Sequence, residues 1–314
     1  METISFGDLE VGRVVEWRGS LRTVSEILPD APAEVWDANR SWLSPDFWNP
    51  VTGAYQIFVQ TWVIRGPGRT VLVDTGIGDD RDRPQVPQFA HLRTGFLDRL
   101  SAAGVRPEQV DIVINTHLHH DHVGWNTRLD AGGWVPAFPN ATYLVPRADY
   151  DHYRPGGTAR MLPAHTDDER RRLDNLRLVF ADSIEPIESA GQLVLWEGEH
   201  RIDDTLRLES APGHTPGSSV VWLESRDARA VFVGDLMHSP VQILHPGYKS
   251  CFDLDAETAR ASRRRVLAAA ARTGATVFPA HFGGHGAVTV QPGPGPDAFA
   301  VSWANLAPEA GDLG

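Results

Sequence analysis

The chain has 314 residues, of which 41% are hydrophobic and 22% charged, a composition typical of a globular protein with a buried core. Its 29 basic and 41 acidic residues give a formal net charge of −12, so the average surface repels nucleic acids and anionic lipid headgroups. The single cysteine, Cys251, excludes an internal disulfide, and we interpret it as a packing residue. With this net charge, an enzyme that acts on nucleic acids would need a local basic patch to bind them.

Two further absences concern membranes and export. No apolar run approaches the roughly 18 residues that a membrane span requires, and residues 1–8 lack the basic and apolar pattern of a secretory leader. We therefore expect a cytoplasmic protein with no membrane partner. The arginines at 170–172 and 177 follow acidic residues, so they are interpreted as a solvated helix face, as are those at 263–265.

The first half of the chain is expected to begin with an irregular, tryptophan-containing strap over residues 1–54. Strands are predicted at 55–65 and 70–75, joined by Gly66-Pro67-Gly68 turn chemistry. A helix is predicted at 92–103, followed by strands at 110–114 and 141–145. Residues 151–168 contain a Pro/Gly run and are predicted to form a loop.

The second half repeats this pattern. Strands are predicted at 192–196, 206–210, 219–223, 230–233 and 275–278. A helix is predicted at 257–273, with Asp255 as its N-cap and Gly274 just past its end. From about residue 287 a Pro/Gly-rich surface tail is expected. Strands alternating with helices indicate a layered α/β protein, which we predict to be a single domain over residues 1–314.

The strongest local signal is a dense group of metal-ligand side chains directly after the predicted strand at 110–114. Four candidate ligands lie within six residues: His117, His119, Asp121 and His122. Imidazole and carboxylate groups suit zinc, and also iron, manganese or cobalt. Side chains alternate in direction along an extended turn, so this segment can serve two metal ions.

Three more candidates stand in loops after predicted strands, where open α/β sheets usually place their sites. They are His214 in Pro-Gly-His-Thr-Pro-Gly, Asp235 in Gly-Asp, and His281 in Ala-His. Each alone is a weak signal, because a lone histidine or a turn aspartate usually has a structural role.

Taken in order, the runs H-L-H-H-D-H, P-G-H-T-P-G, G-D and A-H resemble the metallo-β-lactamase superfamily from Tyr55 to about Gly286. The resemblance implies an αββα sandwich with two mixed β-sheets flanked by helices. It also implies that His117, His119 and His214 bind one metal ion, that Asp121, His122 and His281 bind the other, and that Asp235 bridges them.

Such a pair of divalent ions, Zn²⁺ in the first place and Mn²⁺, Fe²⁺ or Co²⁺ as alternatives, supplies a hydroxide nucleophile near neutral pH. Asp121 or Asp235 would then transfer a proton. In the family, true β-lactamases lack the bridging aspartate, so Asp235 argues against that activity. The resemblance also implies a homodimer.

Within the family, the runs at 234–238, 241–242 and 252–255 are similar to the branch of methyl parathion hydrolase and its lactonase relatives. The favoured function is hydrolysis of a lactone or carboxylic ester. A phosphotriesterase and a thioesterase or polyketide cyclase are the alternatives, and a non-catalytic binding protein is a fourth. Acyl-homoserine lactonases often carry a tyrosine where this chain has His238, so the specific substrate stays open.

Other residues near the candidate ligands have two interpretations. Asp74 either supports a metal-ligating histidine by a hydrogen bond or ends a strand. His120 is expected to face away from the metals. His238, Trp125, Phe282, His285 and Tyr248 could line a substrate pocket, although core packing is commoner for the aromatic residues.

Overall fold

The computed structural model describes residues 3–161, 164–293, 295 and 298–304. Contacts divide this part of the chain into two compact units. Arg13–Trp17 and Val59–Gly198 form the first unit, and the remaining described residues form the second unit.

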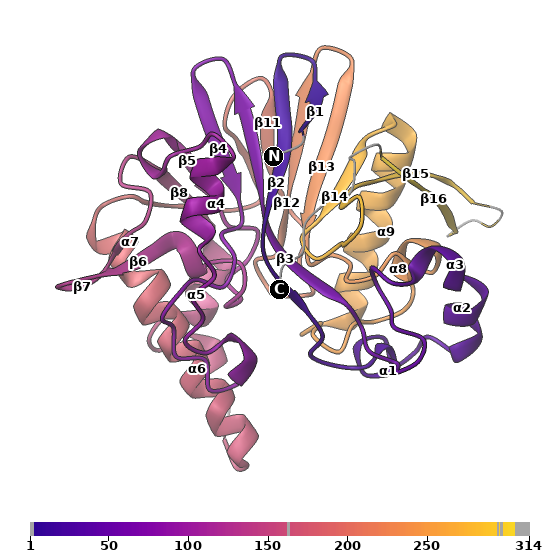
Figure 1. Ribbon diagram of the computed structural model, residues 1–314, viewed down its shortest axis with the longest axis horizontal. Helices are drawn as coiled ribbons and strands as arrows, with labels where there is room; N and C mark the ends of the chain where they lie inside the picture. The colour runs from indigo at the N-terminus through magenta and orange to yellow at the C-terminus, as the bar shows by residue number, and fades with distance from the viewer. Residues whose placement is uncertain (1–2, 162–163, 294, 296–297, 305–314) are drawn as a thin grey trace. The chain divides into compact units, whose positions relative to one another are not determined.

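Two large mixed sheets carry most of the strands (Figure 1). Among the described residues, the first sheet has seven strands in the order β1-β2-β3-β4-β5-β8-β9. Their bounds are β1 Thr3–Phe6, β2 Leu9–Gly19, β3 Ile57–Gly66, β4 Arg69–Val73, β5 Ile112–Ile114, β8 Thr142–Pro146 and β9 Leu193–Trp196. β6 (Thr127–Asp130) and β7 (Gly133–Pro136) form a separate antiparallel hairpin.

The second sheet also has seven strands in the described part of the chain, in the order β10-β11-β12-β13-β14-β15-β16. Their bounds are β10 Glu199–Arg201, β11 Leu206–Ser210, β12 Ser219–Ser225, β13 Ala228–Gly234, β14 Thr276–Pro279, β15 Val288–Pro292 and β16 Phe299–Trp303. β13 and β14 are parallel, with Phe232 opposite Phe278, whereas the other pairs are antiparallel.

Helices and short helical turns connect the strands. The α-helices are α1 Val24–Ile27, α2 Ala33–Ala38, α3 Arg40–Leu43, α4 Phe96–Ala102, α5 Arg147–Tyr153, α6 Asp167–Ser183, α7 Glu185–Ser189, α8 Val241–Leu244 and α9 Ala256–Thr273. The 3₁₀ turns are η1 Pro87–Phe89, η2 Pro107–Gln109, η3 Gly124–Asn126 and η4 Thr158–Met161.

The core of the first unit joins its central strands to α4. The buried cluster combines Val14 of β2, Val63 of β3, Leu72 of β4 and Val113 of β5 with Leu100 of α4. In β4, β5 and β8, which pair in parallel, short runs of β-branched and aliphatic residues form strands that are buried on both faces. The carboxyl ends of β4 and β5 therefore emerge at the same edge of the sheet.

Helix α9 lies alongside β13 and β15 in the second unit (Figure 1). Its predicted caps are confirmed: the Asp255 side chain accepts a hydrogen bond from the Thr258 N–H at 3.1 Å, and Gly274 ends the helix with φ 68°. Arg263 corrects the prediction of a solvated face at 263–265, because its side chain is fully buried against carbonyls and a carboxylate described below.

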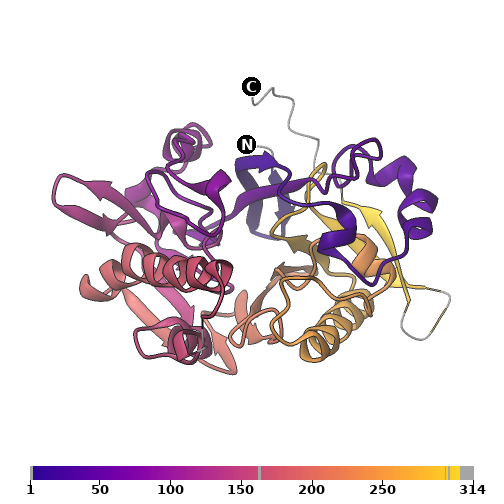
Figure 2. The same ribbon diagram turned by 90° about the horizontal axis from the view of Figure 1, so that it is seen from below.

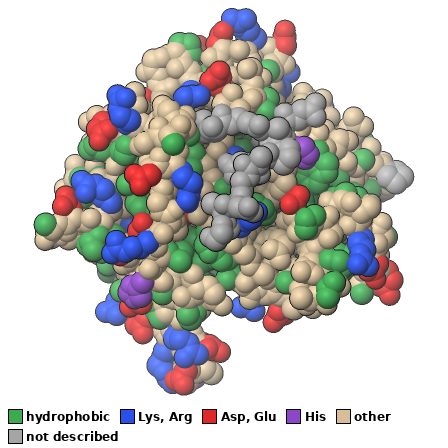
Figure 3. Space-filling view, viewed as in Figure 1, with side chains coloured by type: hydrophobic (Ala, Val, Ile, Leu, Met, Phe, Trp, Pro, Cys, Tyr) green, Lys and Arg blue, Asp and Glu red, His purple; other side chains and the backbone are tan. Residues whose placement is uncertain are grey.

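The arginines at 170–172 and 177 lie on α6, the longest helix of the first unit, which is seen from below in Figure 2. Arg170 pairs with Asp167, Arg171 with Asp168, and Arg177 with Asp174 at 3.5 Å, in each case three residues apart. In Figure 3, basic and acidic side chains lie side by side at the lower end of the view, where α6 begins. This is the solvated helix face that the sequence predicted, and its positive charge is largely offset by its own acidic residues.

Three segments differ from their predictions. The N-terminal strap contains β1 and β2, which pair antiparallel with Phe6 opposite Leu9, and β2 is buried along most of its length. The expected C-terminal tail contributes β15 and β16 to the second sheet. Half of the predicted loop at 151–168 is occupied by the end of α5, by η4 and by the start of α6, although residues 162–163 lie outside the described residues.

The α/β class, with two large mixed sheets and flanking helices, is confirmed. The single-domain organisation stays a prediction. None of the helices in the described ranges is both long enough and apolar enough to cross a membrane.

Replacing Leu100 by alanine should lower the free energy of unfolding by about 2–5 kcal/mol, because it leaves a cavity at a fully buried position of the first unit's core. The matched control is Leu129→Ala at a position that is 52% exposed, for which a change within about 0.5 kcal/mol is expected. Urea denaturation of both variants measures the difference. Equal effects at the two positions would contradict this description of the core.

Candidate metal centre

A buried aspartate orients the histidine motif of the first unit. Asp74 follows β4 in a left-handed conformation (φ 57°) and is 3% exposed. Its carboxylate accepts hydrogen bonds from the Thr116 N–H at 2.8 Å and the Thr116 hydroxyl at 2.9 Å, and it lies 2.9 Å from His122 Nδ1. Because a carboxylate only accepts, His122 donates from Nδ1 and keeps Nε2 as its ligand nitrogen. This is the supporting contact expected for Asp74.

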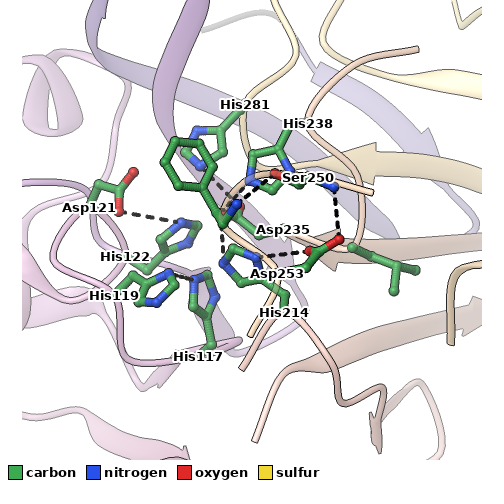
Figure 4. A network of polar contacts seen from close by, with 12 residues as sticks. His117, His119, Asp121, His122, His214, Asp235, His238, Ser250, Asp253 and His281 are labelled. Carbon is green, nitrogen blue, oxygen red and sulfur yellow. Dashed lines mark hydrogen bonds and ion pairs between the residues drawn. The ribbon is translucent and has the colours of Figure 1, made fainter. Parts of the chain in front are cut away.

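The first unit brings its four predicted ligands together in two pairs (Figure 4). His117 Nε2 lies 3.1 Å from His119 Nδ1, and Asp121 Oδ1 lies 3.8 Å from His122 Nε2. In each pair the candidate ligand atoms are within 4.8 Å of each other. The spacing is close enough for each pair to share one ion.

Backbone contacts hold the motif in this shape. The Leu118 N–H donates to the buried Asp149 carboxylate at 2.9 Å, and the Asn115 side chain donates to the His122 carbonyl at 3.1 Å. The ring of His120 instead packs against Phe89, with centroids 5.6 Å apart. His120 is thus engaged with a neighbouring aromatic side chain, in keeping with its predicted exclusion from the ligand set.

In the second unit, His214 stands in the loop after β11 because a glycine lets that loop approach α9. Gly213 has φ 130°, and a Cβ there would lie 2.1 Å from the Ala259 nitrogen, so no larger residue fits without displacing backbone. His214 Nδ1 lies 3.5 Å from Asp253 Oδ1, and Nε2 lies 3.3 Å from Asp235 Oδ2. Burial alone would lower the pKa of His214, but the carboxylates of Asp235 and Asp253 outweigh it and raise the pKa to about 9.

Asp235 directly follows β13, and its two carboxylate oxygens are directed at different imidazoles (Figure 4). Oδ1 lies 3.0 Å from His281 Nε2, and Oδ2 lies 3.3 Å from His214 Nε2 and 3.3 Å from His238 Nε2. His281 Nδ1 lies 2.8 Å from the Phe58 carbonyl. Since that carbonyl can only accept, His281 donates from Nδ1 and presents Nε2 to Asp235.

Asp253 is a buried carboxylate that the sequence did not single out as a site residue. Its Oδ2 accepts a hydrogen bond from the Ser250 N–H at 2.9 Å and lies 3.4 Å from the Arg263 guanidinium. Burial favours the neutral acid, but His214 and Arg263 together lower the pKa of Asp253 below its ordinary value. Arg263 also donates to the Leu236 carbonyl at 2.6 Å. One buried arginine therefore contacts both Asp253 and the backbone next to Asp235.

Tyr55 and Phe58, at the end of the N-terminal strap and the start of β3, support the second unit's candidate ligands from within the same unit. The Tyr55 hydroxyl donates to the His238 carbonyl at 2.5 Å, and both residues are buried. Phe58 provides the carbonyl that orients His281. A Cβ at Gly283 would lie 2.8 Å from the Asp46 carbonyl, which shows how closely the strap packs on the loop after His281.

His238 lies beside Asp235 and is 1% exposed. Its N–H donates to Gln242 Oε1 at 2.7 Å, and its ring lies 5.3 Å from the ring of Phe252. Burial lowers the pKa of His238 despite the nearby Asp235 carboxylate. Burial thus works against a positive charge on the imidazole next to Asp235.

The other predicted pocket residues have mainly packing roles. Trp125 is 5% exposed, stacks on Phe96 at 5.5 Å and belongs to the core of the first unit. Phe282 is fully buried against Phe47 at 5.2 Å. His285 lies 6.0 Å from the ring of Trp303. Cys251 is exposed, which corrects its interpretation as a packing residue.

The functional contacts that sequence reasoning missed are mostly long-range. Tyr55 and His238 are 183 residues apart, and Phe58 and His281 are 223 apart. Asp253 lies in a run quoted for its family resemblance, but nothing in that run distinguishes a buried carboxylate from a helix cap. Only the packing of α9 on the loop after β11 places it beside His214.

The ligand motifs coincide with a known family. The model of the metallo-beta-lactamase superfamily matches residues 54–281, which is more than half of the chain. The chain belongs to the metallo-β-lactamase superfamily. Its motifs in both units fall within or at the end of the matched segment.

Curated relatives within this superfamily match over shorter stretches. The N-acyl homoserine lactonase AttM of Rhizobium johnstonii is 40% identical over 58 residues, 18% of this chain and 19% of the relative. AttM of Azorhizobium caulinodans is 29% identical over 124 residues, 39% of each protein. The chain thus aligns with about a fifth to two-fifths of the length of these relatives.

Solved superfamily structures match over nearly the whole chain. The hydrolase AbOPH of the beta-lactamase superfamily has a TM-score of 0.80 and 22% identity, with 97% of both chains covered. AidC, described as a dizinc quorum-quenching lactonase, has a TM-score of 0.77 with the same identity and coverage. At this identity the likeness establishes the superfamily fold.

Replacing Tyr55 by phenylalanine should lower the free energy of unfolding by about 1–3 kcal/mol, because it leaves the buried His238 carbonyl without its hydroxyl donor. The control is Tyr248→Phe, which removes a hydroxyl from a partly exposed tyrosine; a change within about 0.5 kcal/mol is expected. Urea denaturation compares the two. A Tyr55 variant as stable as the Tyr248 variant would show that the Tyr55 hydroxyl does not stabilise the backbone at His238.

Proposed function

We propose that this superfamily member is a dinuclear metal-dependent hydrolase that opens a lactone or carboxylic ester. The observation that carries the proposal is the geometry of Asp235. One carboxylate oxygen faces His281 and the other faces His214, which is the arrangement required of a carboxylate that bridges two ions. A purely structural aspartate needs only one such partner.

The donor set fits two divalent cations. His117, His119 and His214 would hold one ion, Asp121, His122 and His281 the other, and Asp235 both. Imidazole and carboxylate donors suit Zn²⁺ first, with Mn²⁺, Fe²⁺ or Co²⁺ as alternatives. The hydrogen bonds from Nδ1 of His122 and His281 leave Nε2 of both rings as ligand nitrogens.

Two such ions, when bound, would supply hydroxide near neutral pH and would polarise the carbonyl of the ester. The chain's own residues then have distinct tasks. The Asp121 side chain is 12% exposed and is the better placed carboxylate to move a proton to the leaving alkoxide. Asp235, which faces three imidazoles, holds the ligands in register. Buried His238 excludes water from the side of Asp235 that it covers.

Two considerations support an ester-like substrate over others. The bridging aspartate argues against β-lactam hydrolysis, and several relatives are described as N-acyl homoserine lactonases. His238 in place of the tyrosine common in acyl-homoserine lactonases favours a different acyl lactone or ester. The methyl parathion hydrolase branch, and with it a phosphotriester substrate, is the second candidate, supported by the runs at 234–238 and 252–255. Homodimerisation and a cytoplasmic location stay predictions.

Metal analysis of the protein produced with zinc supplementation should find two ions per chain, because the proposal assigns the seven donors to two ions with Asp235 shared between them. Inductively coupled plasma mass spectrometry of the gel-filtered protein measures the ratio. Dialysis against a chelator should remove both ions and the activity together. A ratio of one ion per chain would contradict the dinuclear centre, and a ratio near zero would contradict the enzyme.

Replacing Asp235 by asparagine should lower lactone hydrolysis by about 100-fold or more, because losing a bridging ligand should cost at least as much as losing an outer partner of a ligand. Proton release from a long-chain acyl lactone, followed in a pH-stat, measures turnover. The control is Asp204→Asn, whose side chain is 97% exposed and which should leave turnover unchanged. Near-normal turnover in the Asp235 variant would refute the bridging role. Two bound ions without lactone hydrolysis in the unmodified protein would favour phosphotriesters or thioesters.

A further inference from the structure

A buried glutamate of the first unit lies outside the ligand set and has no part in the proposed chemistry. Glu16 is on β2 and is 4% exposed. A carboxylate is rarely buried without partners that satisfy it. Its partners therefore indicate what it does.

The Glu16 carboxylate accepts four hydrogen bonds from three separate segments. Oε2 accepts from the Ile77 N–H at 2.6 Å. Oε1 accepts from the Gly78 N–H at 3.0 Å, the Trp125 indole N–H at 2.7 Å and the Thr94 hydroxyl at 3.2 Å. Every one of these groups is a donor to the carboxylate, so a single acceptor joins the turn after β4 to η3.

That turn is built around the carboxylate. Gly76 has φ 61°, and a Cβ there would lie 2.0 Å from Glu16 Oε2. The position therefore excludes a side chain by both conformation and space. The turn cannot shift towards β2 without colliding with Glu16.

The same turn carries the contacts that shape the metal-ligand motif. It begins at Asp74, which orients His122. The Thr75 N–H donates to the His122 carbonyl at 2.7 Å, and the Trp125 N–H donates to the Thr75 carbonyl at 2.8 Å. Glu16 therefore binds residues 77–78, in the turn that begins at Asp74, and also binds Trp125 on the other side of His122 in the sequence.

We infer that Glu16 is a positioning residue of the metal centre, which fixes the orientation of His122 by tying residues 74–78 to Trp125. That Glu16 orients His122 is inferred from the hydrogen bonds of the first unit alone. That this orientation affects metal binding rests on the proposed function. Glu16 touches no ligand and is not itself catalytic.

A Glu16→Gln variant breaks this arrangement in either amide orientation. If the amide nitrogen takes the Oε2 position, it faces the Ile77 N–H; in the other orientation it faces the Gly78 and Trp125 donors. The amide nitrogen therefore opposes at least one other donor in either orientation, while the side-chain size is unchanged. The control is Val14→Ala, two residues earlier on the same face of β2, which removes core contacts but no bond to the turn.

The test is run at pH 8, because burial raises the pKa of Glu16 to about 7 against the lowering effect of its four donors. The metal-free proteins, labelled with ¹⁵N-histidine, are examined by NMR for the His122 Nδ1–H proton, assigned by its loss in His122→Gln. The Glu16 variant should shift or broaden this signal by faster solvent exchange, whereas Val14→Ala should leave it in place. An unchanged signal in the Glu16 variant would overturn the inference.

Titration with Co²⁺, followed by its visible absorption, measures the consequence for binding. Glu16→Gln should weaken the affinity by about tenfold, at the lower end of the effect of removing a ligand's outer partner, and Val14→Ala should not. Wild-type affinity in the Glu16 variant, or equal weakening in both variants, would overturn the inference. If the unmodified protein binds no Co²⁺, the proposed function fails, and the NMR signal still decides whether Glu16 orients His122.

Discussion

The candidate ligands of both units depend on one constraint: a buried imidazole must be held at one nitrogen so that the other nitrogen points in a fixed direction. Asp74 does this for His122, and the Phe58 carbonyl does it for His281. Asp253 lies against Nδ1 of His214. In each case the partner acts through hydrogen bonding or charge and needs no metal ion to be in place.

This constraint brings further buried charges with it. Asp253 is stabilised by the buried Arg263, whose guanidinium also bonds to the Leu236 and Pro246 carbonyls. A buried ion pair adds little stability on its own, but losing one member leaves an uncompensated charge. The networks around Asp253 and Glu16 therefore specify geometry more than they stabilise the fold.

Strand ends explain why such short motifs carry the ligands. Asp74 and the 117–122 motif follow the parallel strands β4 and β5, and Asp235 and His281 follow the parallel strands β13 and β14. Parallel neighbours end at one edge of a sheet, so their following loops converge. The same arrangement occurs in both sheets.

Sequence alone determined the seven candidate ligands, the superfamily, nine of the sixteen strands in the described residues, and the positions of helices α4 and α9. These signals are local: a dense histidine motif, β-branched runs between turns, and the caps of α9 are each contained in a few neighbouring residues. The strands missed at the two ends of the chain have weaker patterns. β2 contains Gly12 and β15 ends on Pro292. Both become strands through pairing with neighbouring strands.

Only the tertiary structure decided which polar residues support the ligands. Glu16 meets the turn at 77–78 across 61 residues of chain, and Tyr55 meets His238 across 183. It also decided that Arg263 is buried while Arg171, in an equally basic run, is exposed. The physical reason is that a hydrogen bond between distant segments depends on the packing of whole sheets and helices, which leaves no periodic or spacing pattern in the sequence around either partner.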